Sequence, residues 1–392
     1  MKSVTPLHIF LIFLRLGFTS FGGPVAHLAY FHEEFVKKRG WYSEQAYADL
    51  VALCQFLPGP ASSQVGMAIG LSKAGYLGAF LAWIGFTLPS AIMLILFALG
   101  IQNYSEILSA QVLHGLKIVA VAVVAQAVWA MATKLCQGIQ KVSTMIIAAV
   151  IVLLFPKIWI QPVVIIIAGI LGTILFKNSL KSHNSAFSVS ISRRSGAIWL
   201  IIFAVLLMVL PYIHSASSSQ FWMMSDSFYR AGSLVFGGGH VVLPLLKAEI
   251  VSTGLVSHDM FLAGYGATQA VPGPLFTFAA FLGSVAVSPP NGIFGGMIAL
   301  IAIFIPSFLL IAGVLPFWSQ LQKNSYIQTA LQGINAAVVG LLLAALYDPV
   351  WTSAVFTLRD FAFVLLAFSA LVYWNIPVWL VVILGGISIG FL

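Results

Sequence analysis

Charged residues are scarce in this sequence. They make up 7% of the 392 residues, whereas apolar residues make up 60%, and the mean hydropathy is +1.04. A soluble protein carries about a quarter charged residues, so this composition excludes one. The length instead allows roughly a dozen helical passages of about 20 residues each. We therefore expect an all-α integral membrane protein.

Cysteines and catalytic motifs are also scarce. The two cysteines, Cys54 and Cys136, lie far apart in apolar surroundings, which gives neither a metal-ligand spacing nor a disulfide framework. The sequence has no His-Glu-x-x-His, Gly-x-Ser-x-Gly, phosphate-binding P-loop or paired-carboxylate signature. We therefore expect a protein that is not an enzyme, holds no metal and needs no cofactor.

Basic residues outnumber acidic ones by 18 to 10, which gives a net charge of +8. They lie in short clusters between apolar runs, where they orient helices rather than bind nucleic acid. With the amino terminus inside, twelve of them fall in inside loops and three outside. The remaining three, Arg15, Lys117 and Arg230, fall within helices. This bias predicts a cytoplasmic amino terminus and an outside carboxyl terminus.

The chain contains an internal repeat. An arginine-glycine motif recurs after 215 positions, and a Pro-Gly-Pro motif recurs after 214 positions. These matches divide the chain into a first unit (residues 1–177), a basic cytoplasmic loop plus linker helix (178–217) and a second unit (218–392). The linker helix turns the second unit over, so we expect two inverted-topology repeats. The matching residues are Arg15, Gly22, Gly23, Pro58, Gly59 and Pro60, and Arg230, Gly237, Gly238, Pro272, Gly273 and Pro274.

Each unit is expected to contain broken helices. The arms beside Pro58-Gly59-Pro60, the first Pro-Gly-Pro turn, reach about 20 Å at 1.5 Å per residue, short of a 30 Å membrane core. Proline removes a backbone donor and glycine permits unusual backbone angles. We therefore expect a re-entrant hairpin here and another break at Gly22-Gly23-Pro24, with full crossings as the alternative.

Two arginines are predicted to lie deep within helices. Arg15 is about ten residues, or 15 Å, into its helix, a burial that costs about 2.5–3.5 kcal/mol, and Arg230 recurs at the matching place. Guanidinium groups fit oxyanions bidentately, so we expect both to converge on an anion at the membrane midplane. The alternative is that they bond helix carbonyls or pair with Asp49, Asp226 or Glu249.

The helices that restart after the two Pro-Gly-Pro turns are predicted to supply the rest of an anion site, through unpaired N–H groups and a positive dipole end. The first restart carries Ser62 and Ser63, whereas the second carries Leu275 and Phe276, so the first is the better candidate for polar contacts. The alternative is that both turns are only hinges or packing kinks. The remaining predicted binding residues are Gln55 and Gln269, and the predicted gating or charge-compensating residues are Glu34, Lys117, Glu249 and Asn335.

These motifs together resemble a known family. An arginine-bearing first helix that ends in Phe21-Gly22-Gly23-Pro24, the sequence Gln55-x-x-Pro58-Gly59-Pro60 and their second copies look like the long, two-domain type of the chromate ion transporter family. The resemblance covers both units, although Gly239 replaces the proline in the second copy. It implies an inner-membrane secondary transporter that exports chromate by alternating access and confers chromate resistance, with sulfate as competitor.

Electrostatics favours export of such an ion. When a dianion leaves a cell with a negative interior, its free energy falls by about 2.3 kcal/mol per charge per 100 mV, or roughly 4.6 kcal/mol for two charges. Two rivals stay open: a proton-coupled importer of sulfate or another oxyanion, and a non-transporting membrane scaffold. The expected partners are an oxyanion and the lipid bilayer, without nucleic acid, and a homodimer is an open alternative.

Overall fold

The structure is a computed structural model that describes residues 4–103, 110–155, 160–176, 191–217, 219–236, 242–321 and 324–390. Every regular element in these ranges is a helix, which confirms the expected all-α class. Large apolar side chains such as Leu96, Ile174 and Met208 are exposed on the outer faces, as suits a lipid environment. The protein is therefore a multi-pass membrane protein. Its described helices of sufficient length and apolarity to cross a membrane are Ala61–Ile101, His114–Leu135, Arg193–Ala216, Gly292–Phe317 and Ser325–Trp351.

The first unit opens with the predicted broken helix. Helix α1 (Pro6–Thr19) ends before Gly22, which has φ of 94°, and the chain resumes as α2 (Gly23–His32). Since glycine adopts such a left-handed conformation at little cost, the predicted break is confirmed. Helix α2 continues directly into a π-helical segment, η1 (Glu33–Lys38).

The first Pro-Gly-Pro turn joins α3 (Glu44–Phe56) to α4 (Ala61–Asn103). Helix α4 is not one straight rod, because the backbone leaves helical geometry at residues 74–75. A side chain on Gly70 would overlap the carbonyl oxygen of Gly78, so the limbs before and after this break pack closely against each other. The two arms beside the turn are thus short, as predicted; their re-entrant path in the membrane stays a prediction.

The second unit follows the same order of elements. The elements are α9 (Gln220–Leu234), α10 (Val242–Leu246) with η3 (Lys247–Val251), α11 (His258–Thr268), α12 (Phe278–Ser284) and α13 (Gly292–Val314). A side chain on Gly283 would overlap the carbonyl oxygen of Gly295. The two helices that carry these glycines, α12 and α13, therefore pack as closely as the two limbs of α4.

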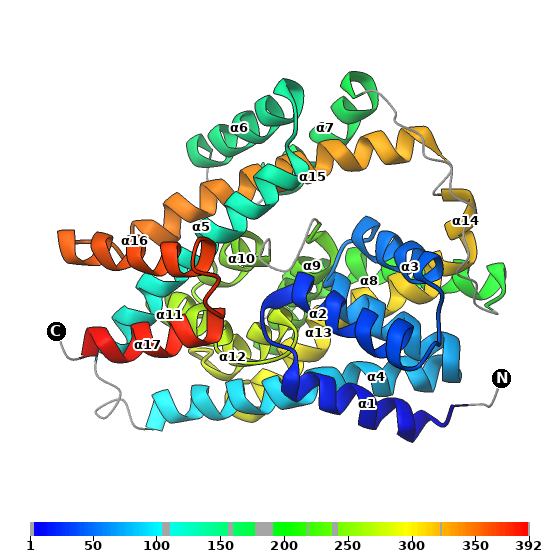
Figure 1. The fold of residues 1–392 in the computed structure, drawn as a ribbon, viewed down its shortest axis with the longest axis horizontal. Coiled ribbons are helices and arrows are strands. Elements are labelled where there is room, and N and C mark those ends of the chain that lie inside the picture. Colours follow the sequence, from blue (N-terminus) through cyan, green and yellow to red (C-terminus); the bar gives the residue numbers. More distant parts are fainter. Residues whose placement is uncertain are drawn as a thin grey trace.

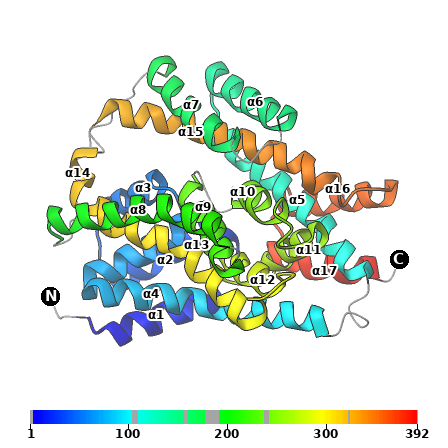
Figure 2. The ribbon, with the colours of Figure 1, turned by 180° about the vertical axis from the view of Figure 1, so that it is seen from behind.

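The later helices are exchanged between the units. Helix α15 (Ser325–Ala345) of the second unit packs on α6 (Ile139–Leu154) and α7 (Ile160–Leu175) of the first. Helix α5 of the first unit packs on α16 and α17 of the second, and Figures 1 and 2 show both arrangements from opposite sides. The bounds of these three helices are Ala110–Leu135, Leu358–Val372 and Val378–Gly390.

A histidine–carboxylate hydrogen bond and a helix cap stabilise one of these exchanged contacts. The Nε2 atom of His114, on α5, lies 3.0 Å from Oδ1 of Asp360 in the first turn of α16. The other carboxylate oxygen accepts the backbone N–H groups of Phe356 and Thr357 at 3.0 and 2.9 Å. Burial alone would raise the pKa of Asp360, but the hydrogen bonds from His114 and these N–H groups outweigh it and hold the pKa below its usual value.

The linker region contains the helix that the sequence predicts. Helix α8 (Arg193–Ala216) covers the unpaired apolar run at 197–214, and almost none of its apolar window is buried within the protein. It packs along α9 and α13 at the edge of the second unit. A helix at this edge position can cross the membrane once between the two units.

Candidate functional site

The two Pro-Gly-Pro turns engage the opposite unit reciprocally. In the first turn, the N–H of Gly59 donates to the carbonyl of Val235, just after α9, at 2.6 Å. In the second turn, Pro272-Gly273-Pro274, the N–H of Gly273 donates to the carbonyl of Ser20, just after α1, at 2.9 Å. Ser20 and Val235 are 215 positions apart, so each turn binds the end of the first helix of the other unit.

Each turn also faces a serine of the opposite unit. Gly59 has φ of 116° and Gly273 has φ of 103°, angles that disfavour other residues. A Cβ on Gly59 would lie 2.5 Å from Oγ of Ser307 on α13, and a Cβ on Gly273 would lie 2.8 Å from Oγ of Ser90 on α4. Both glycines are therefore required by close approach as well as by conformation.

Polar side chains gather at the first turn. Ser62, Ser63 and Gln64, at the start of α4, are at most 2% exposed. The Nε2 of Gln64 donates to the carbonyl of Pro58 at 2.6 Å, and Oγ of Ser62 lies 3.3 Å from Nδ1 of His27. Polar groups at a helix start, beside its positive dipole end, suit an anion.

The second turn is less polar, as the sequence indicates. Leu275 and Phe276 follow it and are buried, and the hydroxyl of Thr277 donates back to the carbonyl of Pro274 at 2.7 Å. Gln269, which precedes the turn, is half-buried, and its Nε2 has no hydrogen-bond partner. The corresponding Gln55 on α3 is exposed.

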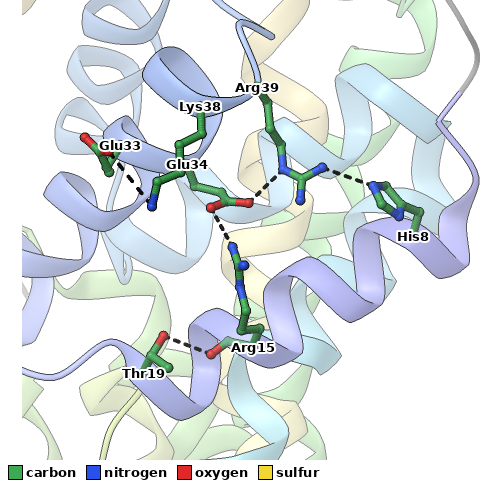
Figure 3. Close-up of polar contacts among 7 residues, drawn as sticks. All are labelled: His8, Arg15, Thr19, Glu33, Glu34, Lys38 and Arg39. Carbon is green, nitrogen blue, oxygen red and sulfur yellow. Dashed lines mark hydrogen bonds and ion pairs between the residues drawn. The ribbon is translucent and has the colours of Figure 1, made fainter.

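Arg15 pairs with a carboxylate of its own unit. Its guanidinium lies 2.5 Å from Oε2 of Glu34, which is 6% exposed, while the side chain of Arg15 is 59% exposed. Arg39 binds the other oxygen of Glu34 at 2.7 Å and also contacts His8 at 3.1 Å, as Figure 3 shows. Arg15 thus ties α1 to the π-helical segment η1.

Arg230 makes the matching pair in the second unit. It lies 2.7 Å from Glu249 on η3 and 3.0 Å from Asp226 on its own helix. This is the carboxylate pairing named above as the alternative for Arg230, and Glu249 stands at the place of Glu34. With all groups ionised, the first cluster carries a net charge of +1, from two arginines and one carboxylate, and the second carries −1.

The other predicted residues have varied positions. Lys117 on α5 forms an ion pair with Asp259 on α11, which links the two units. Asn335, its counterpart on α15, is half-buried, and Gly23 is the first residue of α2 with φ of 75°. Gly237 and Gly238 lie outside the described residues. Ser307 was not predicted; its signal was the repeat of Pro89-Ser90 as Pro306-Ser307.

Comparison with known proteins identifies the family. A family model described as chromate transporter matches residues 7–173 and 222–391. The chain belongs to the chromate transporter family. The predicted resemblance is therefore confirmed.

Several curated proteins are similar over most of the chain. An uncharacterized transporter of Methanocaldococcus jannaschii is 29% identical over 86% of this chain and 83% of its own length. A chromate transport protein of Pseudomonas aeruginosa is 27% identical over 87% of this chain and 80% of its own. The uncharacterized transporter YwrA of Bacillus subtilis is 26% identical over 42% of this chain and 93% of its own. No solved structure matches the chain.

Proposed function

We propose that the protein is a secondary transporter that moves a divalent tetrahedral oxyanion, chromate with sulfate as competitor, across the bacterial inner membrane. Membership of the chromate transporter family supports this proposal, as does the relative of Pseudomonas aeruginosa named as a chromate transport protein. The observation that carries it is the reciprocal engagement of the Pro-Gly-Pro turns by Gly59 and Gly273. Secondary transporters bind their cargo at broken helices between two repeats.

The units 1–177 and 218–392 are proposed to be inverted copies. Turn-to-helix and exchanged-helix contacts each occur in both directions between the units, and a glycine-to-glycine contact occurs once within each unit, as a two-fold relation between the units requires. The single helix α8 between them supplies the odd crossing that gives the copies opposite orientations. With the basic residues inside, the amino terminus is cytoplasmic and the carboxyl terminus is outside.

One difference between the units supports alternating access. Helix α5 covers α11 so closely that a side chain on Gly266 would overlap the Leu116 carbonyl oxygen. The equivalent residue on α3 is Ala52, which is exposed together with Ala48 and Gln55. Among the described residues, α15 does not cover α3 as α5 covers α11. We interpret the covered α11 as a closed entrance and the exposed α3 as an open one. Transport then requires the two units to exchange these arrangements.

The arginine clusters have a positioning role in this proposal. Arg15 and Arg230 each join the first helix of a unit to a π-helical segment, η1 in the first unit and η3 in the second. Because that helix end receives the opposite Pro-Gly-Pro turn, the ion pairs set the position of the turn as well. Direct contact between these arginines and the cargo stays a prediction.

Transport by inverted membrane vesicles tests the function and its direction. Vesicles that contain the protein are expected to accumulate labelled chromate when the lumen is made positive, without ATP or a proton gradient, and excess sulfate should slow uptake. Vesicles without the protein are the control. Uptake into right-side-out vesicles that depends on an inward proton gradient would favour the importer. No flux in either orientation, with no effect of any anion on melting temperature, would favour the scaffold.

A further inference from the structure

Buried polar atoms without partners gather beside the first Pro-Gly-Pro turn. They are Oγ of Ser63, Oε1 of Gln64 and Oγ of Ser307, on side chains that are between 0 and 2% exposed. Buried polar atoms in proteins almost always have hydrogen-bond partners. The two hydroxyls can donate hydrogen bonds to a ligand, whereas Oε1 of Gln64 can only accept them. The unpaired hydroxyls of Ser63 and Ser307 therefore indicate a ligand that offers acceptor oxygens.

The geometry brings Gln64 and Ser307 together across the two units. Ser307, on α13 of the second unit, and Gln64, on α4 of the first, both flank Gly59: Oγ and Nε2 lie 2.5 and 2.7 Å from the position of a Cβ there. Ser63 precedes Gln64 in the first turn of α4, where the first N–H groups have no partner within the helix. The turn, the helix start and a hydroxyl of the other unit thus meet at one place.

The matching serine of the other turn shows that the free hydroxyl is not required by the fold. Ser90 occupies the place of Ser307, yet its Oγ donates to the carbonyl of Thr87 at 3.0 Å. Thr277 occupies the place of Ser63, and its hydroxyl donates to the carbonyl of Pro274. Ser63 and Ser307 are therefore left unpaired at positions where the repeat offers a paired alternative.

We propose that the hydroxyls of Ser63 and Ser307, with the N–H groups that begin α4, form an uncharged binding site for the transported oxyanion. This inference rests on the proposed function and specifies which groups donate hydrogen bonds to the transported ion. Gln64 holds the turn through Pro58 and offers its second Nε2 hydrogen. The arginines are already paired with carboxylates. Neutral donors suit a carrier, because the ion must be bound firmly enough to enter and weakly enough to leave.

The test measures anion binding and stability in the same variants. Ser63→Ala and Ser307→Ala should leave the melting temperature of the unliganded protein unchanged or raise it, because each removes an unpaired buried hydroxyl. Each should weaken chromate binding about tenfold, read from the melting-temperature shift against chromate concentration, and should lower vesicle uptake in parallel. Ser307→Cys, which keeps the size but donates weakly, should resemble Ser307→Ala.

Ser284→Ala is the matched control. Ser284 is a fully buried serine whose hydroxyl donates to the carbonyl of Ala280 at 2.8 Å, so its loss should lower the melting temperature while the chromate-induced shift persists. Wild-type shift and uptake in both Ser63→Ala and Ser307→Ala would overturn the neutral site and leave the transport function standing. Absence of chromate, sulfate and molybdate binding and flux in the wild type would instead overturn the proposed function.

Discussion

A side chain placed on Gly59 should break the contact between the units. Gly59→Ala forces a Cβ into φ of 116°, 2.5 Å from Ser307 and 2.7 Å from Gln64. The left-handed backbone costs about 1–2 kcal/mol, and overpacking of a closed site costs about 1–3 kcal/mol. We therefore expect a loss of about 2–5 kcal/mol in the free energy of unfolding.

Gly40→Ala separates the two contributions. Gly40 also has a positive φ, 59°, but a Cβ there would meet nothing within 4 Å. It should therefore cost about 1–2 kcal/mol, the backbone contribution alone. The free energy of unfolding is measured for both variants by titration with dodecyl sulfate in mixed micelles.

A double substitution then tests whether the clash crosses between the units. Ser307→Ala removes the nearer of the two contacting atoms, so the pair Gly59→Ala and Ser307→Ala should show a favourable coupling of about 0.5–3 kcal/mol. Equal losses in Gly59→Ala and Gly40→Ala, or no coupling in the double variant, would refute the reciprocal turn contact.

Three further predictions follow from contacts described above. Cysteines at Gln45 and Asn335, the counterparts of Asp259 and Lys117, should crosslink slowly in the free protein and faster with chromate, if α15 closes on α3; an unchanged rate would contradict alternating access. Glu34→Gln should destabilise the protein more than Glu249→Gln, because Arg15 and Arg39 both lose their carboxylate partner, whereas Arg230 keeps Asp226; melting temperatures in detergent test this order. The pKa of Asp360 is lowered on folding, so its stabilisation is full above the ordinary carboxyl pKa and lost as pH falls through the lowered value; the stability gap to Asp360→Asn should close there.

The repeat made much of this arrangement predictable from the sequence. The positions of the Pro-Gly-Pro turns, the break at Gly22 and the linker helix could be read from local residue types, because glycine and proline act on their own backbone. The partner of Arg15 could not, since Glu34 is 19 residues away across a break and a change to π-helical geometry. The environment of Ser307 likewise depends on contacts between units, which no local pattern encodes.

The exchange of helices has a consequence for the order of synthesis. Helices α6 and α7 leave the ribosome about 150 residues before α15, the helix that covers them. At about 5–20 residues per second, they remain in the bilayer for roughly 8–30 s with the faces that α15 later covers in contact with lipid or a chaperone. Gly172, whose close neighbour is the Thr329 carbonyl, lies on such a face, so a bulky residue there should delay assembly long after translation has ended.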